Sequence, residues 1–300
     1  MASRRKNSEV CFADANGIRI AYDTFGKPSA PPMLLIMGLA CQMIIWDDEF
    51  CTRLAERGYW VIRFDNRDIG QSQKFDSAGV PDISELIAAQ INRAPLKAPY
   101  TLSDMAADAV GLLDALEIQS AHVVGASMGG MIAQLMALEY PHRVRTLTSI
   151  MSSTGDPNLP PPKPEGLQVL YAPLPTDRQG FIEAYMEVWR ILSGPKHPVS
   201  DSLAMNYAER TFERGLNPEG VIRQYAAILA SGSRKEALAG LEVPALVIHG
   251  DQDPLVPVEC GIDTAEAIPG ARLVIIEGMG HAFPEALWPR IIDEIANHAT

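Results

Sequence analysis

Short apolar stretches recur along the chain, and most of them are apolar on both faces of a strand. This pattern is typical of strands that helices cover on both sides of a sheet. It predicts strands at residues 33–37, 60–64, 121–125, 145–151, 245–249 and 272–276. The segments on either side of Asn16-Gly17 predict an antiparallel hairpin at the sheet edge, because this dipeptide favours a tight turn.

Between these strands, apolar residues recur at the spacing of amphipathic helices. The pattern predicts helices over residues 47–57, 103–116, 127–140, 258–267 and 285–298. Thr101 or Ser103 is the expected N-cap of the second helix. Alternating strands and helices build βαβ units, so the predicted class is α/β, with a mostly parallel central sheet flanked by helices.

One part of the chain departs from this alternation. Five prolines between Pro157 and Pro164 predict an irregular linker, and only helical patterns follow it as far as about Gly240. Helices without strands cannot extend a parallel sheet. We therefore expect residues 1–155 and 237–300 to form the two halves of one core, with 156–236 inserted as a helical cap. The alternative is that these helices simply flank the sheet.

The composition narrows the class of protein without naming a function. Of 300 residues, 47% are hydrophobic and 21% charged, as in ordinary folded proteins, and the net charge of -12 disfavours nucleic acid or anionic lipid as a partner. Free thiols in a reducing compartment are expected for the cysteines, which are Cys11, Cys41, Cys51 and Cys260. The basic N-terminal segment lacks a signal peptide's apolar stretch, and no apolar run is long enough to span a membrane. These features predict a cytoplasmic protein without membrane insertion.

The segment Gly125-Ala126-Ser127-Met128-Gly129 directly follows a predicted strand and opens a predicted helix. A Gly-x-Ser-x-Gly turn in this context exposes its serine at a helix N-terminus, whose N–H groups stabilise developing negative charge. The flanking glycines give room for the strained turn. The alternatives are a plain helix start or a phosphate-binding turn, but the glycine patterns of phosphate loops are absent. Ser127 is therefore the predicted nucleophile.

A serine hydroxyl needs a base and an acid that orients the base. In this type of fold the acid comes after the serine in sequence and the histidine comes last. Asp253 and His281 each follow one of the last two predicted strands, so we expect both near Ser127 at the carboxyl edge of the sheet. Asp251 is the competing acid, although its position suits a turn residue. A metal site built on His249 and the two aspartates is disfavoured because no second ligand cluster completes it.

Acyl transfer also needs two N–H donors for the oxyanion. The N–H of Met128, directly after the nucleophile, is expected to be one of them. The other should come from the loop after the strand at 33–37, where Gly38 permits a turn and the N–H of Leu39 is the best candidate. The alternative is that this loop is only a strand-ending turn.

These motifs resemble those of the α/β-hydrolase superfamily over nearly the whole chain. GASMGG (125–130) is similar to the nucleophile elbow, HGDQDPLVP (249–257) to the acid loop and GMGHAFP (278–284) to the histidine loop. The resemblance implies an α/β-hydrolase fold with an inserted cap.

The chain departs from the superfamily pattern at two places. RFDNRDIGQS (63–72) resembles the DxRGxGxS turn but has Asp68 where glycine is usual, and the resemblance implies that Asp65 and Arg67 are scaffold residues. The superfamily often has His-Gly in the oxyanion loop, where this chain has Met37-Gly38.

Residues 36–72 are similar to the opening of aclacinomycin methylesterase and its relatives. This resemblance favours a carboxylic-ester hydrolase over other activities, but it does not carry over the substrate, which the cap residues set. The aromatic residues of the expected cap predict small to medium apolar esters. The serine mechanism predicts a covalent acyl-enzyme and needs no cofactor or metal. A lactonase, such as an acyl-homoserine lactone hydrolase, a cofactor-free perhydrolase, a C–C bond hydrolase and a slow-turnover ligand-binding protein remain as alternatives. The sequence leaves the oligomeric state open, a homo-oligomer included.

Overall fold

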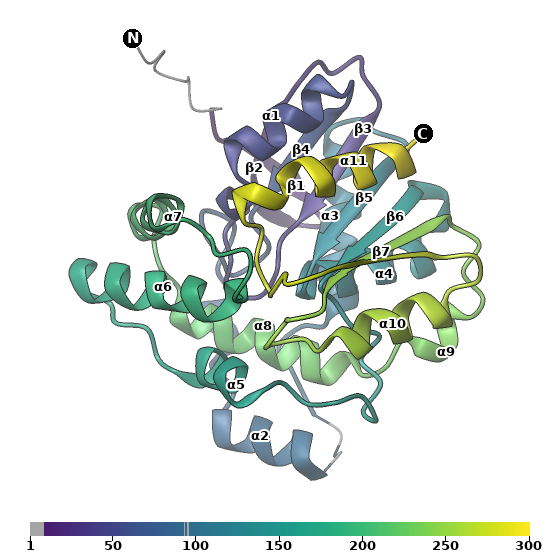
Figure 1. The fold of residues 1–300 in the computed structure, drawn as a ribbon. Coiled ribbons are helices and arrows are strands. Elements are labelled where there is room, and N and C mark those ends of the chain that lie inside the picture. Colours follow the sequence, from purple (N-terminus) through teal and green to yellow (C-terminus); the bar gives the residue numbers. More distant parts are fainter. Residues whose placement is uncertain (1–8, 93, 95) are drawn as a thin grey trace.

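The computed structural model describes residues 9–92, 94 and 96–300, and within them the apolar strands form one sheet (Figure 1). This sheet has eight strands in the described residues, in the order β1-β2-β4-β3-β5-β6-β7-β8. The strands are Cys11–Ala15 (β1), Ile18–Phe25 (β2), Pro32–Ile36 (β3), Trp60–Phe64 (β4), Ala121–Ala126 (β5), Val144–Ile150 (β6), Ala245–Gly250 (β7) and Arg272–Ile276 (β8). β2 is antiparallel to both of its neighbours, and the pairs from β4 to β8 are parallel.

The predicted α/β fold class is confirmed, and each predicted strand begins and ends within one residue of its expected position. The edge hairpin is also present. Asn16 and Gly17 connect β1 to β2 with φ values of 52° and 75°, the positive values that a tight hairpin turn needs.

Helices cover both faces of the sheet. The described helices are Asp48–Glu56 (α1), Ile83–Asn92 (α2), Leu102–Ala115 (α3), Met128–Glu139 (α4), Pro164–Tyr171 (α5), Arg178–Ser193 (α6), Asp201–Glu213 (α7), Pro218–Ser231 (α8), Lys235–Leu238 (α9), Val258–Ala267 (α10) and Trp288–His298 (α11). On β3, Met33 and Leu35 pack into one apolar cluster with α1 and α11, while Leu34 and Ile36 pack into another with α3 and α4. Two covered faces explain why the strand is apolar at successive positions.

Of the two expected N-caps of α3, the structure has Thr101, whose side chain accepts a hydrogen bond from Asp104 N. The helix predictions are corrected at two other places. The last helix begins at Trp288, after the separate 3-10 turn Glu285–Leu287. Helix α2 has no counterpart in the prediction; its sequence lacks the strong apolar stripe of a helix that packs on a sheet, and four of its first five residues are not buried.

The chain between β6 and β7 is fully described and contains helices α5 to α9 but no strand. The proline-rich stretch is irregular as far as Lys163, and Pro164 is the first residue of α5. A proline fits this position because the first N–H of a helix has no partner inside the helix. Helices α5, α6 and α7 lie together on one side of the sheet (Figure 1).

The parallel arrangement decides where the functional residues lie. Strands β3 to β8 run the same way, so the segments after β3, β5, β7 and β8 leave the sheet at one edge. These are the segments that carry Leu39, Ser127, Asp253 and His281. None of the helices in the described ranges is long and apolar enough to cross a membrane.

Candidate active site

Ser127 occupies a sharp turn between β5 and α4. Its backbone has φ 55° and ψ -122°, a conformation that non-glycine residues rarely adopt, and it is the N-cap of α4. The turn is tight because a Cβ atom on Gly125 would lie 2.1 Å from the carbonyl oxygen of Gly129. The Ser127 N–H donates to Ile150 O of β6 at 2.9 Å, and its side chain is partly exposed. The turn therefore has the geometry expected of a nucleophile elbow.

A second serine, in the segment after β6, supports this turn. The hydroxyl of Ser152, which is buried, donates to Ser127 O at 2.8 Å. The sequence does not predict this contact, because nothing local in the segment after β6 indicates that Ser152 lies behind the serine turn. Ser152 comes close to Ser127 only because β5 and β6 are neighbours in the sheet.

Asp253 and His281 lie together, although 28 residues separate them in the sequence. His281 Nδ1 is 2.6 Å from Asp253 Oδ2, and the two residues are only 7% and 1% exposed. The other oxygen of Asp253 accepts hydrogen bonds from the N–H groups of Leu255 and Val256, both at 2.8 Å. The carboxylate is thus fixed by backbone donors on one oxygen while the other faces the imidazole.

Asp251 has a different role in the structure. Its Oδ1 accepts a hydrogen bond from Gly278 N at 2.6 Å, so the side chain joins the loop after β7 to the loop after β8. The loop after β8 is also held by α6, because His281 N donates to Leu192 O at 2.6 Å and Gly280 N to Ser193 O at 2.9 Å. His281 therefore depends on both the core and α6 for its position.

His249 is a second histidine near the acid, and it is completely buried. Its Nε2 lies 2.8 Å from Val256 O and 3.6 Å from Asp253 Oδ2. Burial lowers the pKa of His249, and the nearby Asp253 carboxylate offsets this only in part. Within the described ranges, no group of three or more His, Cys, Asp and Glu side chains has the geometry to hold a metal ion.

The loop after β3 runs directly past Ser127. A Cβ atom on Gly38 would lie 3.0 Å from Ser127 Cβ and 3.5 Å from Ser127 Oγ, so only glycine leaves the space in front of the hydroxyl clear. In the described part of the chain, the N–H groups of Leu39 and Met128 donate to no protein acceptor. Two unpaired N–H donors beside a serine can stabilise an oxyanion.

The structure brings these residues to one edge of the sheet, but it does not join all of them. In the residues described, the Ser127 hydroxyl makes no hydrogen bond, neither to His281 nor to another side chain. The complete triad therefore stays a prediction. Catalytic hydrogen bonds are often long in a structure without substrate.

The turn after β4 is built into the scaffold. Asp65 is buried, and its carboxylate accepts hydrogen bonds from Met43 N and Gln71 N. Arg67 makes two hydrogen bonds to the carboxylate of Asp108 on α3, at 2.6 and 2.7 Å. Neither side chain contacts Ser127, in keeping with the scaffold role that the resemblance implies.

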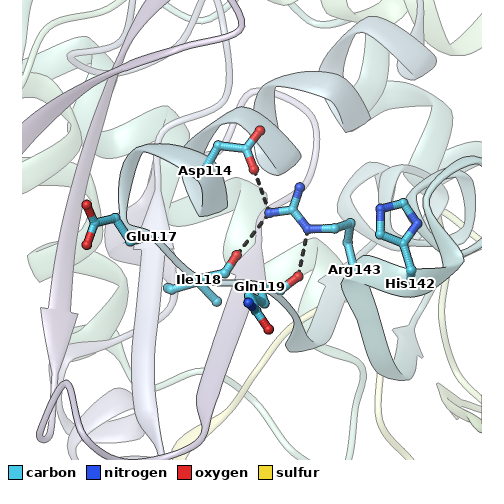
Figure 2. Close-up of a pocket in the computed structure, with 6 residues that line it drawn as sticks. All are labelled: Asp114, Glu117, Ile118, Gln119, His142 and Arg143. Carbon is cyan, nitrogen blue, oxygen red and sulfur yellow. Dashed lines mark hydrogen bonds and ion pairs between the residues drawn. The ribbon is translucent and has the colours of Figure 1, made fainter.

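A hollow elsewhere on the surface does not resemble a catalytic site. Figure 2 shows that it is lined by Asp114, Glu117, Ile118, Gln119, His142 and Arg143. The guanidinium of Arg143 donates hydrogen bonds to the carbonyl groups of Ile118 and Gln119 and forms an ion pair with Asp114. The hollow lies at the amino ends of β5 and β6, away from the edge where ligands of parallel sheets bind.

Comparisons with known proteins agree with this fold. The sequence matches the α/β hydrolase fold family over residues 31–285. It is 33% identical over 294 residues to rhodomycin D methylesterase DauP of Streptomyces sp. (strain C5). The aligned region covers 91% of this chain and 92% of that protein.

Two solved structures extend the comparison. The enol-lactonase from Burkholderia xenovorans LB400 has a TM-score of 0.68 and 23% identity, covering 95% of this chain and 99% of its own, which shows the fold alone. Est816, described as an N-acyl homoserine lactone degrading enzyme, has a TM-score of 0.65 and 25% identity, covering 90% of this chain and 93% of its own. The chain belongs to the α/β hydrolase fold family and resembles the methylesterases within it.

Proposed function

We propose that this hydrolase is a serine carboxylesterase in which Ser127, His281 and Asp253 form the catalytic triad. One observation carries the proposal: a serine with φ 55° stands at the N-terminus of α4, at the same sheet edge as a buried histidine–aspartate pair. The strained serine has no structural purpose of its own, because a residue with negative φ would start a helix more easily.

In the proposed mechanism, Ser127 Oγ attacks the ester carbonyl carbon while His281 Nε2 takes its proton. The N–H groups of Leu39 and Met128 stabilise the oxyanion. Asp253 fixes the imidazole with Nδ1–H toward its carboxylate and stabilises the imidazolium. The imidazolium then protonates the leaving alcohol. Water, deprotonated by His281, releases the carboxylic acid and restores Ser127.

We propose that residues 156–236 act as a cap over this site and favour apolar esters. Aromatic side chains from α6 and α7 pack in the same apolar cluster as Phe283, two residues after His281; they are Phe181, Tyr185, Trp189 and Tyr207. A pocket bounded by such side chains should admit apolar groups and exclude charges near the carbonyl. A cytoplasmic location and a cofactor-free reaction belong to the same proposal.

The nucleophile is tested by the Ser127→Ala variant. It should lower kcat for p-nitrophenyl esters by about 10⁴-fold or more while the far-UV circular dichroism spectrum stays unchanged. A fluorophosphonate should label the wild type at Ser127. Ser153→Ala is the matched control, since the Ser153 hydroxyl accepts a hydrogen bond from Gly155 N and lies outside the proposed triad. Labelling of Ser152, Ser153 or a cysteine would overturn the assignment.

A lactonase is the second candidate, because Est816 is 25% identical over 90% of this chain. A substrate panel of p-nitrophenyl esters, methyl esters, acyl-homoserine lactones and C–C hydrolase substrates separates these activities. For the esters, kcat/KM should rise about fourfold per methylene from acetate to hexanoate and then fall, since each buried methylene contributes about 0.8 kcal/mol. Faster opening of lactones than of every ester would favour the lactonase.

A further inference from the structure

The loop after β3 is held from the outside by a side chain of α8. Gln224 is completely buried, and its Oε1 accepts a hydrogen bond from Ala40 N at 3.2 Å. Its Nε2 donates to Arg67 O, in the turn after β4, at 2.8 Å. The amide of Gln224 thus joins two loops of the core, and Ala40 is the residue next to Leu39.

The two hydrogen bonds suit a side-chain amide. Ala40 N offers a donor and Arg67 O offers an acceptor, and the amide of Gln224 accepts from one with its oxygen and donates to the other with its nitrogen. At this position a carboxylate would lack the donor, and an apolar side chain would leave two buried backbone groups unpaired.

Ala40 needs this support because its backbone is in the left-handed region, with φ 63°. A non-glycine residue in this region is strained and persists where its surroundings hold it. The bond from Ala40 N to Gln224 fixes the orientation of the peptide between Leu39 and Ala40. That peptide shares the Leu39 Cα with the peptide whose N–H is the proposed oxyanion donor.

Helix α8 is itself anchored at the preceding residue. Arg223 makes two hydrogen bonds to the carboxylate of Asp68, both at 2.8 Å, and both side chains are completely buried. Asn217, the N-cap of α8, donates to Asp68 O at 2.8 Å. Asp68 is the residue that stands where the superfamily usually has glycine. Its contacts set α8 against the core so that Gln224 reaches Ala40.

The loop also lacks the support that a histidine before the glycine would give. Met37 occupies that position, and its carbonyl oxygen accepts a hydrogen bond from Asn66 Nδ2 at 2.9 Å. Asn66 therefore holds the start of the loop, while Gln224 holds the part beyond Leu39. The two amides support the loop on either side of the proposed donor.

We propose that Gln224 is a positioning residue that keeps the Leu39 N–H aimed at the oxyanion, with the Asp68–Arg223 pair placing it. This inference rests on the proposed acyl transfer at Ser127. Gln224 touches no reacting atom, so it acts on the transition state through the loop. Its loss should therefore lower kcat and leave the binding of the ground-state ester nearly unchanged.

The Gln224→Met variant removes both hydrogen bonds at similar volume. We expect kcat for a p-nitrophenyl ester to fall about 10- to 100-fold, less than the loss of a whole oxyanion donor, with KM within about twofold of wild type. A phenylboronic acid, which forms a tetrahedral adduct with serine, should bind more weakly by a similar factor. Ala227→Gly is the matched control, because it weakens α8 without removing a hydrogen bond to the loop after β3.

The outcomes separate this inference from the proposed function. If the wild type neither turns over esters nor reacts with a fluorophosphonate, the proposed function fails. If the wild type is active but Gln224→Met matches Ala227→Gly, or raises KM with kcat unchanged, Gln224 has no positioning role. Should Gln224→Met not fold, Gln224→Asn keeps a buried amide that is too short for both partners. It should show the same fall in kcat, and wild-type kcat in that variant would overturn the inference.

Discussion

Ser127 and Ala40 both have positive φ without being glycine, and Ala40 comes two residues after Gly38, which lies against Ser127. Such conformations cost about 1–3 kcal/mol each. They persist because neighbours hold them: Ile150 and Ser152 at Ser127, and Gln224 at Ala40. At the scale of single residues, the site therefore contains strained conformations that hydrogen bonds from other elements stabilise.

The two aspartates after β7 should be separable by single substitutions. Asp253→Asn should lower kcat by about 10⁴-fold, because an amide cannot hold the imidazole in the required tautomer or stabilise its charge. Asp251→Asn should instead lower the free energy of unfolding by about 1 kcal/mol through its weakened bond to Gly278 N, with kcat within severalfold of wild type. Ester turnover and urea unfolding of both variants test this, and an inactive Asp251→Asn beside an active Asp253→Asn would refute it.

Helix α8 connects the segment between β6 and β7 to the turn after β4. Arg223 on α8 is not the only donor to the Asp68 carboxylate. Tyr100 OH donates to it at 2.7 Å, and Phe75 N donates to it at 2.8 Å. Burial acts to raise the pKa of Asp68, but the hydrogen bonds from Arg223, Phe75 and Tyr100 hold it below its ordinary value. The carboxylate is thus charged and fully satisfied inside the protein.

Restoring the glycine of the superfamily at this position should destabilise the protein. Asp68→Gly relieves a positive φ of 69°, worth about 1 kcal/mol, but it leaves Arg223 buried without its main partner, at about 3–5 kcal/mol. We expect a net loss of about 2–4 kcal/mol, measured in urea. Asp68→Gly with Arg223→Met should recover much of this loss. A single variant as stable as wild type would show that the pair does not anchor α8.

At the scale of the whole molecule, stability should depend on pH through a histidine far from the site. His122 on β5 is buried beside Tyr59, and its Nδ1 is 2.9 Å from Thr146 Oγ1. Burial, with smaller contributions from the charges of Arg145 and His298, lowers the pKa of His122 to about 4. The unfolded chain therefore binds a proton at this residue at higher pH than the folded chain does.

The sign of the effect follows from this difference. The contribution of neutral His122 to the free energy of unfolding is fully present above pH 6.5, the ordinary pKa of histidine. It is lost as the pH falls from there to about 4. Over this pH interval, the free energy of unfolding of the His122→Gln variant should fall by about 2 kcal/mol less than that of the wild type. Thermal unfolding from pH 7 to 4 measures it, with His142→Gln, at an exposed position, as the control. Parallel pH curves for wild type and His122→Gln would contradict the prediction.

The sequence by itself determined the strands, most helices and the position of the glycine-flanked serine turn, because these are local properties. A strand covered on both faces must be apolar at successive positions, and a strained serine turn needs glycines beside it. Asp253 and His281 followed from strand order, since parallel strands end at one edge. The structure adds that these two side chains are in contact.

Only the tertiary structure decided how the site is supported. Gln224 lies 184 residues from Ala40 in the sequence, and Arg223 lies 155 residues from Asp68. A buried amide or ion pair of this kind leaves no periodic signal, because either partner alone looks like an ordinary polar residue of a turn or a helix. The need for a partner arises when folding removes water from both groups, and the partner is then chosen by which helix packs against which loop.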